Sequence, residues 1–219
     1  MNKWNPTSRA AAVDAILQRA PVLPVLTIEH LDDAVPLANA LVDGGLPVLE
    51  VTLRSDVALA AIARIRHEVP GALVGAGTVL DPAALRSAAQ AGALFAISPG
   101  ASNALYDAAA DAAIPFIPAI ATATELLQGI ATGHRRFKFF PAEAAGGIAA
   151  LKAFSGPFAN IRFCPTGGID AARAADYLAL SNVVTVGGSW MVPADALRAQ
   201  DWGRITSLAT QASRLRPTP

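Results

Sequence analysis

The sequence contains little of several features that would otherwise set its class. Its 219 residues include one cysteine, Cys164, which excludes an intramolecular disulfide and a multi-cysteine metal site. Seventeen acidic side chains balance seventeen basic ones, so no net charge attracts nucleic acid or an anionic membrane. No apolar run approaches the ~20 residues of a membrane-spanning helix, and the first residues lack the apolar core of a secretory signal. We therefore expect a cytoplasmic protein with no nucleic-acid or membrane partner.

Histidine is also scarce. His30, His67 and His134 form no HxH or HExxH motif, which disfavours a zinc-dependent reaction. Cys164 lies within the apolar run IRFCP (161–165), where a packing role is favoured over a nucleophilic one. We expect neither a metal site nor a cofactor.

What the sequence does contain is a regular alternation of two kinds of segment. Short β-branched or apolar runs are followed by longer, alanine-rich segments with helical spacing, which is typical of βαβ units around a parallel sheet. The predicted strands cover residues 22–28, 48–53, 73–79, 94–98, 116–120, 137–140, 161–165 and 183–186. The predicted helices between them cover residues 31–42, 56–68, 82–91, 103–112, 124–131, 147–154 and 171–180.

Eight strands in this alternation predict an α/β fold, a (β/α)8 TIM barrel formed by residues 1–219 as a single domain. An extra N-terminal helix at about residues 9–18 should pack against the bottom of the barrel, and a last helix should cover residues 202–214. Asp81, Thr124 and Asp170 are the expected starts of three helices. An open doubly wound sheet is the alternative. Its first strand should lead into a GxGxxG turn, whereas this one leads into TIEH (27–30).

Polar residues at the carboxyl ends of the strands are the first candidates for a site, because barrel enzymes place their chemistry there. Lys138 stands within FKFF (137–140), and burying an ammonium is unfavourable unless it is paired or neutralised. The phenylalanines around it favour the neutral amine, which can attack a ketone carbonyl. The alternative is a lysine that reaches solvent from an edge strand or pairs with a carboxylate. A closed barrel has no edge strand.

Glu50 lies on the second strand, on the same face as Thr52 and Arg54 by the two-residue period. A carboxylate on the interior face near Lys138 suits a general acid and base. A structural ion pair of Glu50 with Arg54 or Lys138 is the alternative interpretation.

Three further residues could bind a substrate carboxylate. Arg54 offers a two-pronged guanidinium, although an arginine at a strand end is often only a solvated loop residue. Thr78 and the peptide groups around Pro99 could hold the other carboxylate oxygen. With Lys138, these residues favour a 2-keto acid such as pyruvate as the group that reacts.

Two glycine pairs follow the last two strands, in TGG (166–168) and GGS (187–189). Glycine lets main-chain N–H groups approach an anion, and the loops after strands seven and eight are the recurrent phosphate site of barrels. One Gly-Gly pair also marks ordinary turns. Two pairs at these strands, with the hydroxyl of Ser189, favour a phosphorylated substrate.

Six segments resemble the 2-dehydro-3-deoxy-6-phosphogluconate aldolase family. They are EVTLR (50–54), VGAGTVL (74–80), FAISPG (95–100), FKFFPAE (137–143), FCPTGGI (163–169) and GGSWMVPAD (187–195), and the resemblance extends over about residues 15–214. It implies a class I aldolase that cleaves 2-dehydro-3-deoxy-6-phosphogluconate to pyruvate and glyceraldehyde 3-phosphate in the Entner–Doudoroff pathway. It also implies a homotrimer.

The resemblance further implies a role for individual residues. Lys138 matches the Schiff-base lysine and Glu50 the general acid and base. The pyruvate part would be surrounded by Arg54, Thr78 and Pro99, with Phe140 packing by the imine. The phosphate end would be received by Thr166, Gly167, Gly168, Gly188 and Ser189.

Other functions remain open from the sequence. Within the same family, the main substrate could be 4-hydroxy-2-oxoglutarate or the phosphogalactonate epimer. A metal-free phosphosugar isomerase or epimerase could use Glu50 as its base without a covalent lysine, and a non-catalytic protein could simply bind a phosphosugar. Binding alone, however, does not require an inward-facing Lys138.

Overall fold

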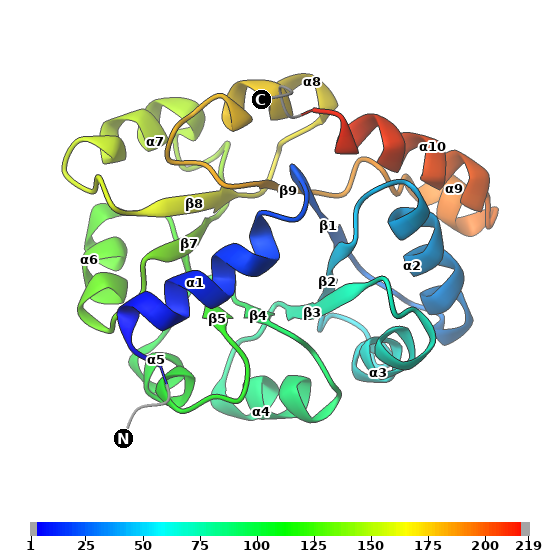
Figure 1. The fold of residues 1–219 in the computed structure, drawn as a ribbon, viewed down its shortest axis with the longest axis horizontal. Helices are drawn as coiled ribbons and strands as arrows, with labels where there is room; N and C mark the ends of the chain where they lie inside the picture. Colours follow the sequence, from blue (N-terminus) through cyan, green and yellow to red (C-terminus); the bar gives the residue numbers. More distant parts are fainter. Residues whose placement is uncertain (1–3, 216–219) are drawn as a thin grey trace.

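The computed structural model describes residues 4–215, in which strands and helices alternate along the chain (Figure 1). The strands are β1 (Val22–Leu26), β2 (Val48–Thr52), β3 (Leu73–Gly77), β4 (Ala96–Ile97), β5 (Phe116–Ile117), β6 (Ala119–Ile120), β7 (Arg136–Phe139), β8 (Arg162–Pro165) and β9 (Val186–Gly188). The helices are α1 (Pro6–Leu17), η1 (Leu31–Asp33), α2 (Ala34–Asp43), α3 (Ala58–Glu68), α4 (Pro82–Gln90), α5 (Asn103–Ala110), α6 (Ala123–Ala131), α7 (Gly147–Ser155), α8 (Ala171–Leu178), α9 (Ala194–Arg198) and α10 (Trp202–Ser213). The predicted α/β class is confirmed.

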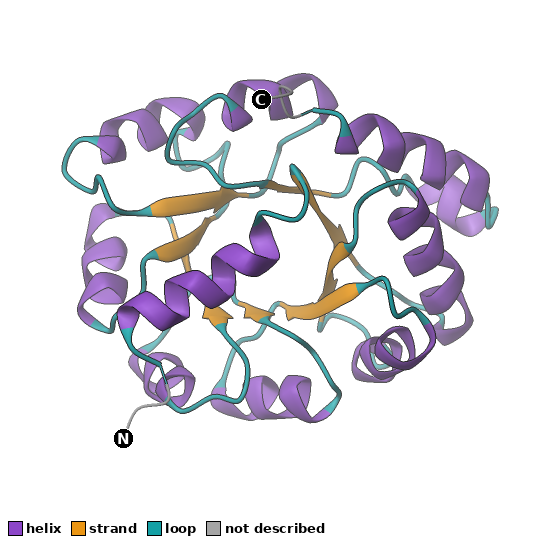
Figure 2. Cartoon of the chain, in the orientation of Figure 1, coloured by secondary structure: helices purple, strands orange, loops and turns teal. Residues whose placement is uncertain are grey.

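Among the described residues, the strands form two parallel sheets that curl toward each other. One sheet has the order β5-β4-β3-β2-β1-β9 and the other the order β6-β7-β8. Two isolated parallel bridges, Phe163 with Val183 and Thr166 with Gly187, connect β8 with the segment that contains β9. Helices surround the strands on the outside (Figure 2). All strands therefore run in one direction, and their carboxyl ends share one face of the molecule.

Two of the predicted strands differ from the observed ones in more than where their ends fall. The strand expected at 116–120 is divided into β5 and β6 at Pro118, which has no N–H group to donate to a neighbouring strand. Its carbonyl still accepts a hydrogen bond from the Lys138 N–H at 2.9 Å. The strand expected at 183–186 is instead β9 at Val186–Gly188, because Val183 makes only an isolated bridge.

The buried apolar side chains form two clusters, one on each side of the sheets. The larger cluster lies between strands and helices. The smaller one, here called the inner cluster, joins side chains from strands around the curl, including Leu23, Val48, Ile117 and Cys164. Helix α1 runs across the sheets in Figure 1 and adds Val13 and Leu17 to the inner cluster. Side chains that alternate with these along the strands face outward to the helices.

Helix starts follow local capping chemistry. The side chains of Asp81 and Asp170 accept hydrogen bonds from main-chain N–H groups in the first turns of α4 and α8, as predicted. The prediction for Thr124 was wrong, because α6 begins at Ala123 and its cap lies two residues before Thr124. Thr122 is its cap and forms a capping box with Glu125. Helix α9 was not predicted.

None of the helices in residues 4–215 has the length and apolar character needed to cross a bilayer.

Candidate active site

Lys138 and Glu50 come from different sheets and meet inside the curl. The Lys138 Nζ donates to Glu50 Oε1 at 2.8 Å and lies 3.2 Å from Oε2. Exposure is 6% for Lys138 and 1% for Glu50. Each side chain stands beside the inner cluster, since Glu50 is two residues beyond Val48 on β2 and Lys138 pairs with Cys164 of β8. Two opposite charges buried in contact compensate each other, and removal of either would leave its partner buried without a counter-charge.

The space for Glu50 exists because the adjacent strand carries glycine. Gly77 of β3 pairs with Thr52 of β2, and a β-carbon at position 77 would overlap the Glu50 Oε1 atom. A second glycine makes room in the same way, because a β-carbon at Gly187 would overlap the hydroxyl of Thr166. These strand glycines therefore make room for the side chains of Glu50 and Thr166 on neighbouring strands.

The phenylalanines near Lys138 in the sequence do not all surround it. Phe137 and Phe139 belong to the larger cluster, between the strands and the helices, where Phe139 packs edge-on against Phe154 and Phe163. Strand alternation sends them to the face opposite Lys138. Phe140 lies differently, with its ring centroid 5.5 Å from the Lys138 Nζ. Of the three aromatic neighbours expected to act on the amine, one does so directly.

Arg54 and Thr78 are brought together at the carboxyl ends of β2 and β3. The Arg54 Nε donates to the Thr78 hydroxyl at 3.2 Å. Thr78 has φ +58°, a left-handed conformation that costs a β-branched residue about 1–2 kcal/mol. Pro99 follows β4, the strand that pairs with β3, and it is half-buried. Arg54 is exposed.

Thr166, Gly167 and Gly168 follow β8 directly and form a turn. Thr166 is buried, while Gly167 and Gly168 have φ values of +105° and +76°, which favour glycine. Within residues 4–215, neither glycine N–H donates a hydrogen bond to another residue. Gly188 ends β9, and the exposed Ser189 follows it. The bridge between Thr166 and Gly187 places this end of β9 next to the same turn. Such a turn offers main-chain donors to an anion.

Cys164 is fully buried beside Lys138 and Glu50 and packs in the inner cluster, as the sequence predicted. Burial raises the pKa of its thiol to about 12, although the nearby Lys138 acts in the opposite direction. The thiol therefore stays protonated near neutral pH and is a poor nucleophile.

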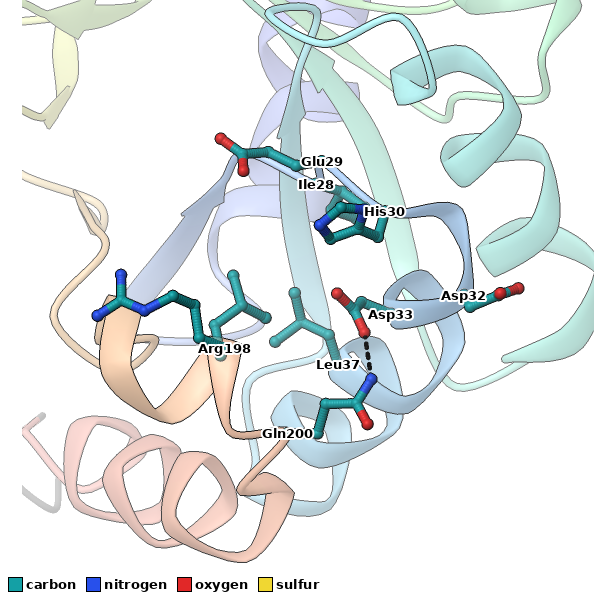
Figure 3. A pocket seen from close by; sticks show the side chains of 9 residues that line it. Ile28, Glu29, His30, Asp32, Asp33, Leu37, Arg198 and Gln200 are labelled. Carbon is teal, nitrogen blue, oxygen red and sulfur yellow. Dashed lines mark hydrogen bonds between the residues drawn. The ribbon is translucent and has the colours of Figure 1, made fainter.

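Two cavities adjoin the carboxyl end of β1. One, of about 340 Å³, includes Thr27 and Ser189 in its lining. The other, of about 400 Å³, lies between η1 and α9, where Asp33 accepts a hydrogen bond from Gln200 at 2.9 Å (Figure 3). His30 lines this second cavity. In the described part of the chain, no group of three or more His, Cys, Asp and Glu side chains is arranged to hold a metal ion.

Two residues of this region, Thr27 and Glu143, were not predicted from the sequence to have a role. Thr27 contacts the buried Thr52 hydroxyl at 3.0 Å, which ties the end of β1 to the strand of Glu50. Glu143 follows Lys138 by five residues and touches both the Gly167–Gly168 turn and helix α8. Its place directly after the lysine strand was the available signal.

A buried lysine in contact with a carboxylate, at the carboxyl ends of curled parallel strands, suits an enzyme that acts through an imine. The chain is an aldolase, a lyase that cleaves a carbon–carbon bond. It belongs to the KDPG and KHG aldolase family, whose profile matches residues 13–208.

Individual relatives are similar over nearly their whole length. The KHG/KDPG aldolase of Escherichia coli (strain K12) is 53% identical over 212 residues, which are 97% of each chain. The 2-dehydro-3-deoxy-phosphogluconate aldolase of Dickeya dadantii (strain 3937) is also 53% identical, again over 97% of each chain. A crystal structure of KDPG aldolase from Legionella pneumophila contains pyruvate captured as a covalent carbinolamine. It is 46% identical, with a TM-score of 0.90 over 96% of this chain and 99% of that one.

Proposed function

We propose that this aldolase uses Lys138 to form a Schiff base and Glu50 as the general acid and base. The observation that carries the proposal is the 2.8 Å contact between Lys138 Nζ and Glu50 Oε1, with both side chains buried. This contact provides a direct path for the proton that the ammonium must lose before the amine can attack. The carbinolamine in the Legionella pneumophila relative supports the same chemistry.

The reaction begins when neutral Lys138 adds to the C2 ketone and forms a carbinolamine. Protonated Glu50 then helps water to leave, and a protonated imine results. Glu50 next takes the proton of the C4 hydroxyl, directly or through a water. The C3–C4 bond breaks, its electron pair moves into the imine, and an aldehyde departs from a pyruvate enamine. Protonation at C3 and hydrolysis release pyruvate and restore Lys138.

The carboxylate of the reacting end is proposed to bind Arg54 and Thr78, with Pro99 beside it and Phe140 against the imine. Support comes from the contact between Arg54 and Thr78 and from the ring of Phe140 near the Lys138 Nζ. A guanidinium is suited to a carboxylate because its N–H groups match two oxygen atoms.

The phosphate end is proposed to bind at Thr166, Gly167, Gly168, Gly188 and Ser189. The support is the turn at Gly167 and Gly168, whose N–H groups donate to no described residue, together with the exposed Ser189 hydroxyl next to it. A phosphate oxygen is a good acceptor for such donors.

The substrate that fits both ends is 2-dehydro-3-deoxy-6-phosphogluconate, cleaved to pyruvate and glyceraldehyde 3-phosphate in the Entner–Doudoroff pathway. Relatives named for this activity support the choice. The second candidate is 4-hydroxy-2-oxoglutarate, favoured by the combined name of the Escherichia coli relative. The free N–H groups of the turn favour the phosphorylated substrate.

The finer features of the architecture belong to the same proposal. Residues 1–219 would form one domain, a closed (β/α)8 barrel in which β5 and β6 count as one strand and the bridges near β9 join the two sheets. Helix α1 would be an extra N-terminal helix over the end of the barrel. We also propose a homotrimer, which the family resemblance supports, and a cytoplasmic location.

Borohydride trapping tests the proposal. The protein is incubated with pyruvate, reduced, digested and analysed by peptide mass spectrometry. A pyruvate-dependent adduct on Lys138 is expected. If folded protein gives no adduct, the covalent mechanism is wrong and a metal-free isomerase with Glu50 as its base becomes the better candidate. Pyruvate release from the phosphorylated substrate separates an enzyme from a protein that only binds phosphosugars.

A further inference from the structure

Glu143 joins three parts of the protein around the Gly167–Gly168 turn. Its main-chain N–H donates to the Gly167 carbonyl at 3.1 Å, and the preceding Ala142 N–H donates to the Thr166 carbonyl at 2.8 Å. The segment after β7 thus continues to pair with the segment after β8. The strand that carries Lys138 is therefore linked to the turn within a few residues.

The side chain of Glu143 also supports this turn. At Gly168, a β-carbon would lie 2.8 Å from the Glu143 Cγ and 2.9 Å from its Cβ, so the glycine packs directly on the glutamate stem. Any side chain larger than hydrogen at position 168 would push Gly168 and Glu143 apart. The position of the turn consequently depends on the position of Glu143.

The carboxylate of Glu143 is held by two residues of α8. The Tyr177 hydroxyl donates to Oε1, and Arg173 forms an ion pair through Oε2. Tyr177 is completely buried, and burial together with Glu143 raises the pKa of its hydroxyl, which keeps the proton available for donation. Both partners lie on the helix that begins directly after the turn, where the Asp170 side chain accepts from the Arg173 N–H at 3.0 Å.

The charges of Glu143 and Arg173 together are also compatible with an anionic ligand at the turn. A lone carboxylate against the turn would repel a phosphate, but Arg173 neutralises it. Arg173 is itself about half-exposed, at 49% of its side-chain surface, and so remains open to solvent. Fixed donors in a preset geometry bind an anion without the cost of ordering them.

We propose that Glu143 is a positioning residue that, with Tyr177 and Arg173, holds the Gly167–Gly168 turn in the geometry that receives the phosphate of the substrate. This inference rests on the proposed function. Glu143 touches the turn and not the reacting atoms, so it acts on the binding of the phosphorylated end and not on imine formation at Lys138.

The test compares two acceptor aldehydes in the condensation direction. Pyruvate is combined with glyceraldehyde 3-phosphate or with unphosphorylated glyceraldehyde, and KM and kcat are measured for wild type, Glu143→Gln and Tyr177→Phe. Glu143→Gln keeps the shape of the side chain but loses the ion pair with Arg173, while Tyr177→Phe keeps the ion pair and loses the hydroxyl. The matched control is Glu68→Gln, which removes an exposed ion pair with Arg64 on α3.

Both variants are expected to raise KM for the phosphorylated aldehyde about fivefold to twentyfold, a loss of the size that one charged or neutral hydrogen bond carries. The constants for glyceraldehyde should remain within about twofold of wild type, as should all constants of Glu68→Gln. Equal shifts with both aldehydes, or no shift with either, would overturn the inference. Tyr177→Phe serves as the second variant if Glu143→Gln loses the fold, which thermal unfolding reports.

Pyruvate trapping on the same proteins separates this inference from the proposed function. Wild type, Glu143→Gln and Tyr177→Phe are all expected to form the borohydride-reduced adduct on Lys138 at similar rates. Absence of the adduct in wild type would remove the proposed function and this inference with it. Normal adducts without any change in phosphate discrimination would remove this inference alone.

Discussion

At one end of the candidate site, Lys138 and Glu50 form an ion pair, and both side chains are almost completely buried. At the other end, Gly167 and Gly168 present main-chain N–H groups at a surface that is partly open to solvent. The first end depends on which functional group a side chain carries. The second depends on the absence of a side chain, because both glycines have positive φ and Gly168 packs directly against Glu143.

This difference has a consequence for substitution. Exchange of a functional group at the buried end should abolish chemistry, whereas addition of a methyl group at the glycine end should weaken the binding of phosphate. Loss of an interaction that is made equally in the ground and transition states raises KM, and loss of an interaction made only in the transition state lowers kcat. The two ends should therefore separate in kinetic measurements.

Lys138→Arg should have the largest effect, because a guanidinium keeps the positive charge beside Glu50 but cannot form the imine. We expect kcat to fall by about 10³-fold or more, with the melting temperature close to that of wild type. Steady-state assays of pyruvate release and thermal unfolding measure both. If the variant retained even a tenth of wild-type activity, the Schiff-base mechanism would be wrong.

Glu50→Gln should follow, since the amide keeps the shape of the carboxylate but cannot accept and return protons. We expect kcat to fall about 10²- to 10³-fold, the usual contribution of a general acid and base, and the adduct with pyruvate to form more slowly. Glu68→Gln is the matched control on an exposed helix face. Unchanged kcat would assign Glu50 to the alternative role of a structural partner for Lys138.

The sequence predicted the buried end well for a physical reason. The two-residue period of a strand fixes which side chains share a face, so Glu50 could be placed inward, and a lysine among phenylalanines is unusual enough to notice. The same period sends Phe137 and Phe139 to the face opposite Lys138, so only Phe140 lies near the amine. The expectation of three surrounding rings failed for that reason.

The parts that the sequence did not predict depend on contacts between distant residues. Nothing local to Glu143 indicates that it meets Tyr177, 34 residues further along the chain. Two other differences have local causes. Thr122 and Glu125 have the three-residue spacing of a capping box, which favours Thr122 over Thr124 as the cap. Pro118 divides a run that is otherwise apolar.

Gly168→Ala should test the glycine end with an intermediate effect. The alanine is strained at φ +76°, by about 1–2 kcal/mol, and its β-carbon collides with the Glu143 stem. We expect KM for the phosphorylated substrate to rise about tenfold while kcat changes little. Gly156→Ala is the control, because no atom lies within 4 Å of its β-carbon position. A fall in kcat with unchanged KM would show that the turn serves chemistry and not binding.

Ser189→Ala should have the smallest effect, and it decides whether the glycine end works through its main chain. Ser189 is exposed, so its hydroxyl exchanges a hydrogen bond with water for one with the phosphate. The net gain from such an exchange is about 0.5–1.5 kcal/mol, which predicts a rise in KM of a few-fold and unchanged kcat. The main-chain donors at Gly167 and Gly168 remain in this variant. If Ser189→Ala raised KM more than Gly168→Ala, phosphate binding would depend more on a side-chain hydroxyl than on the main-chain donors. Both ends of the site would then depend on side chains, and the contrast between them would be lost.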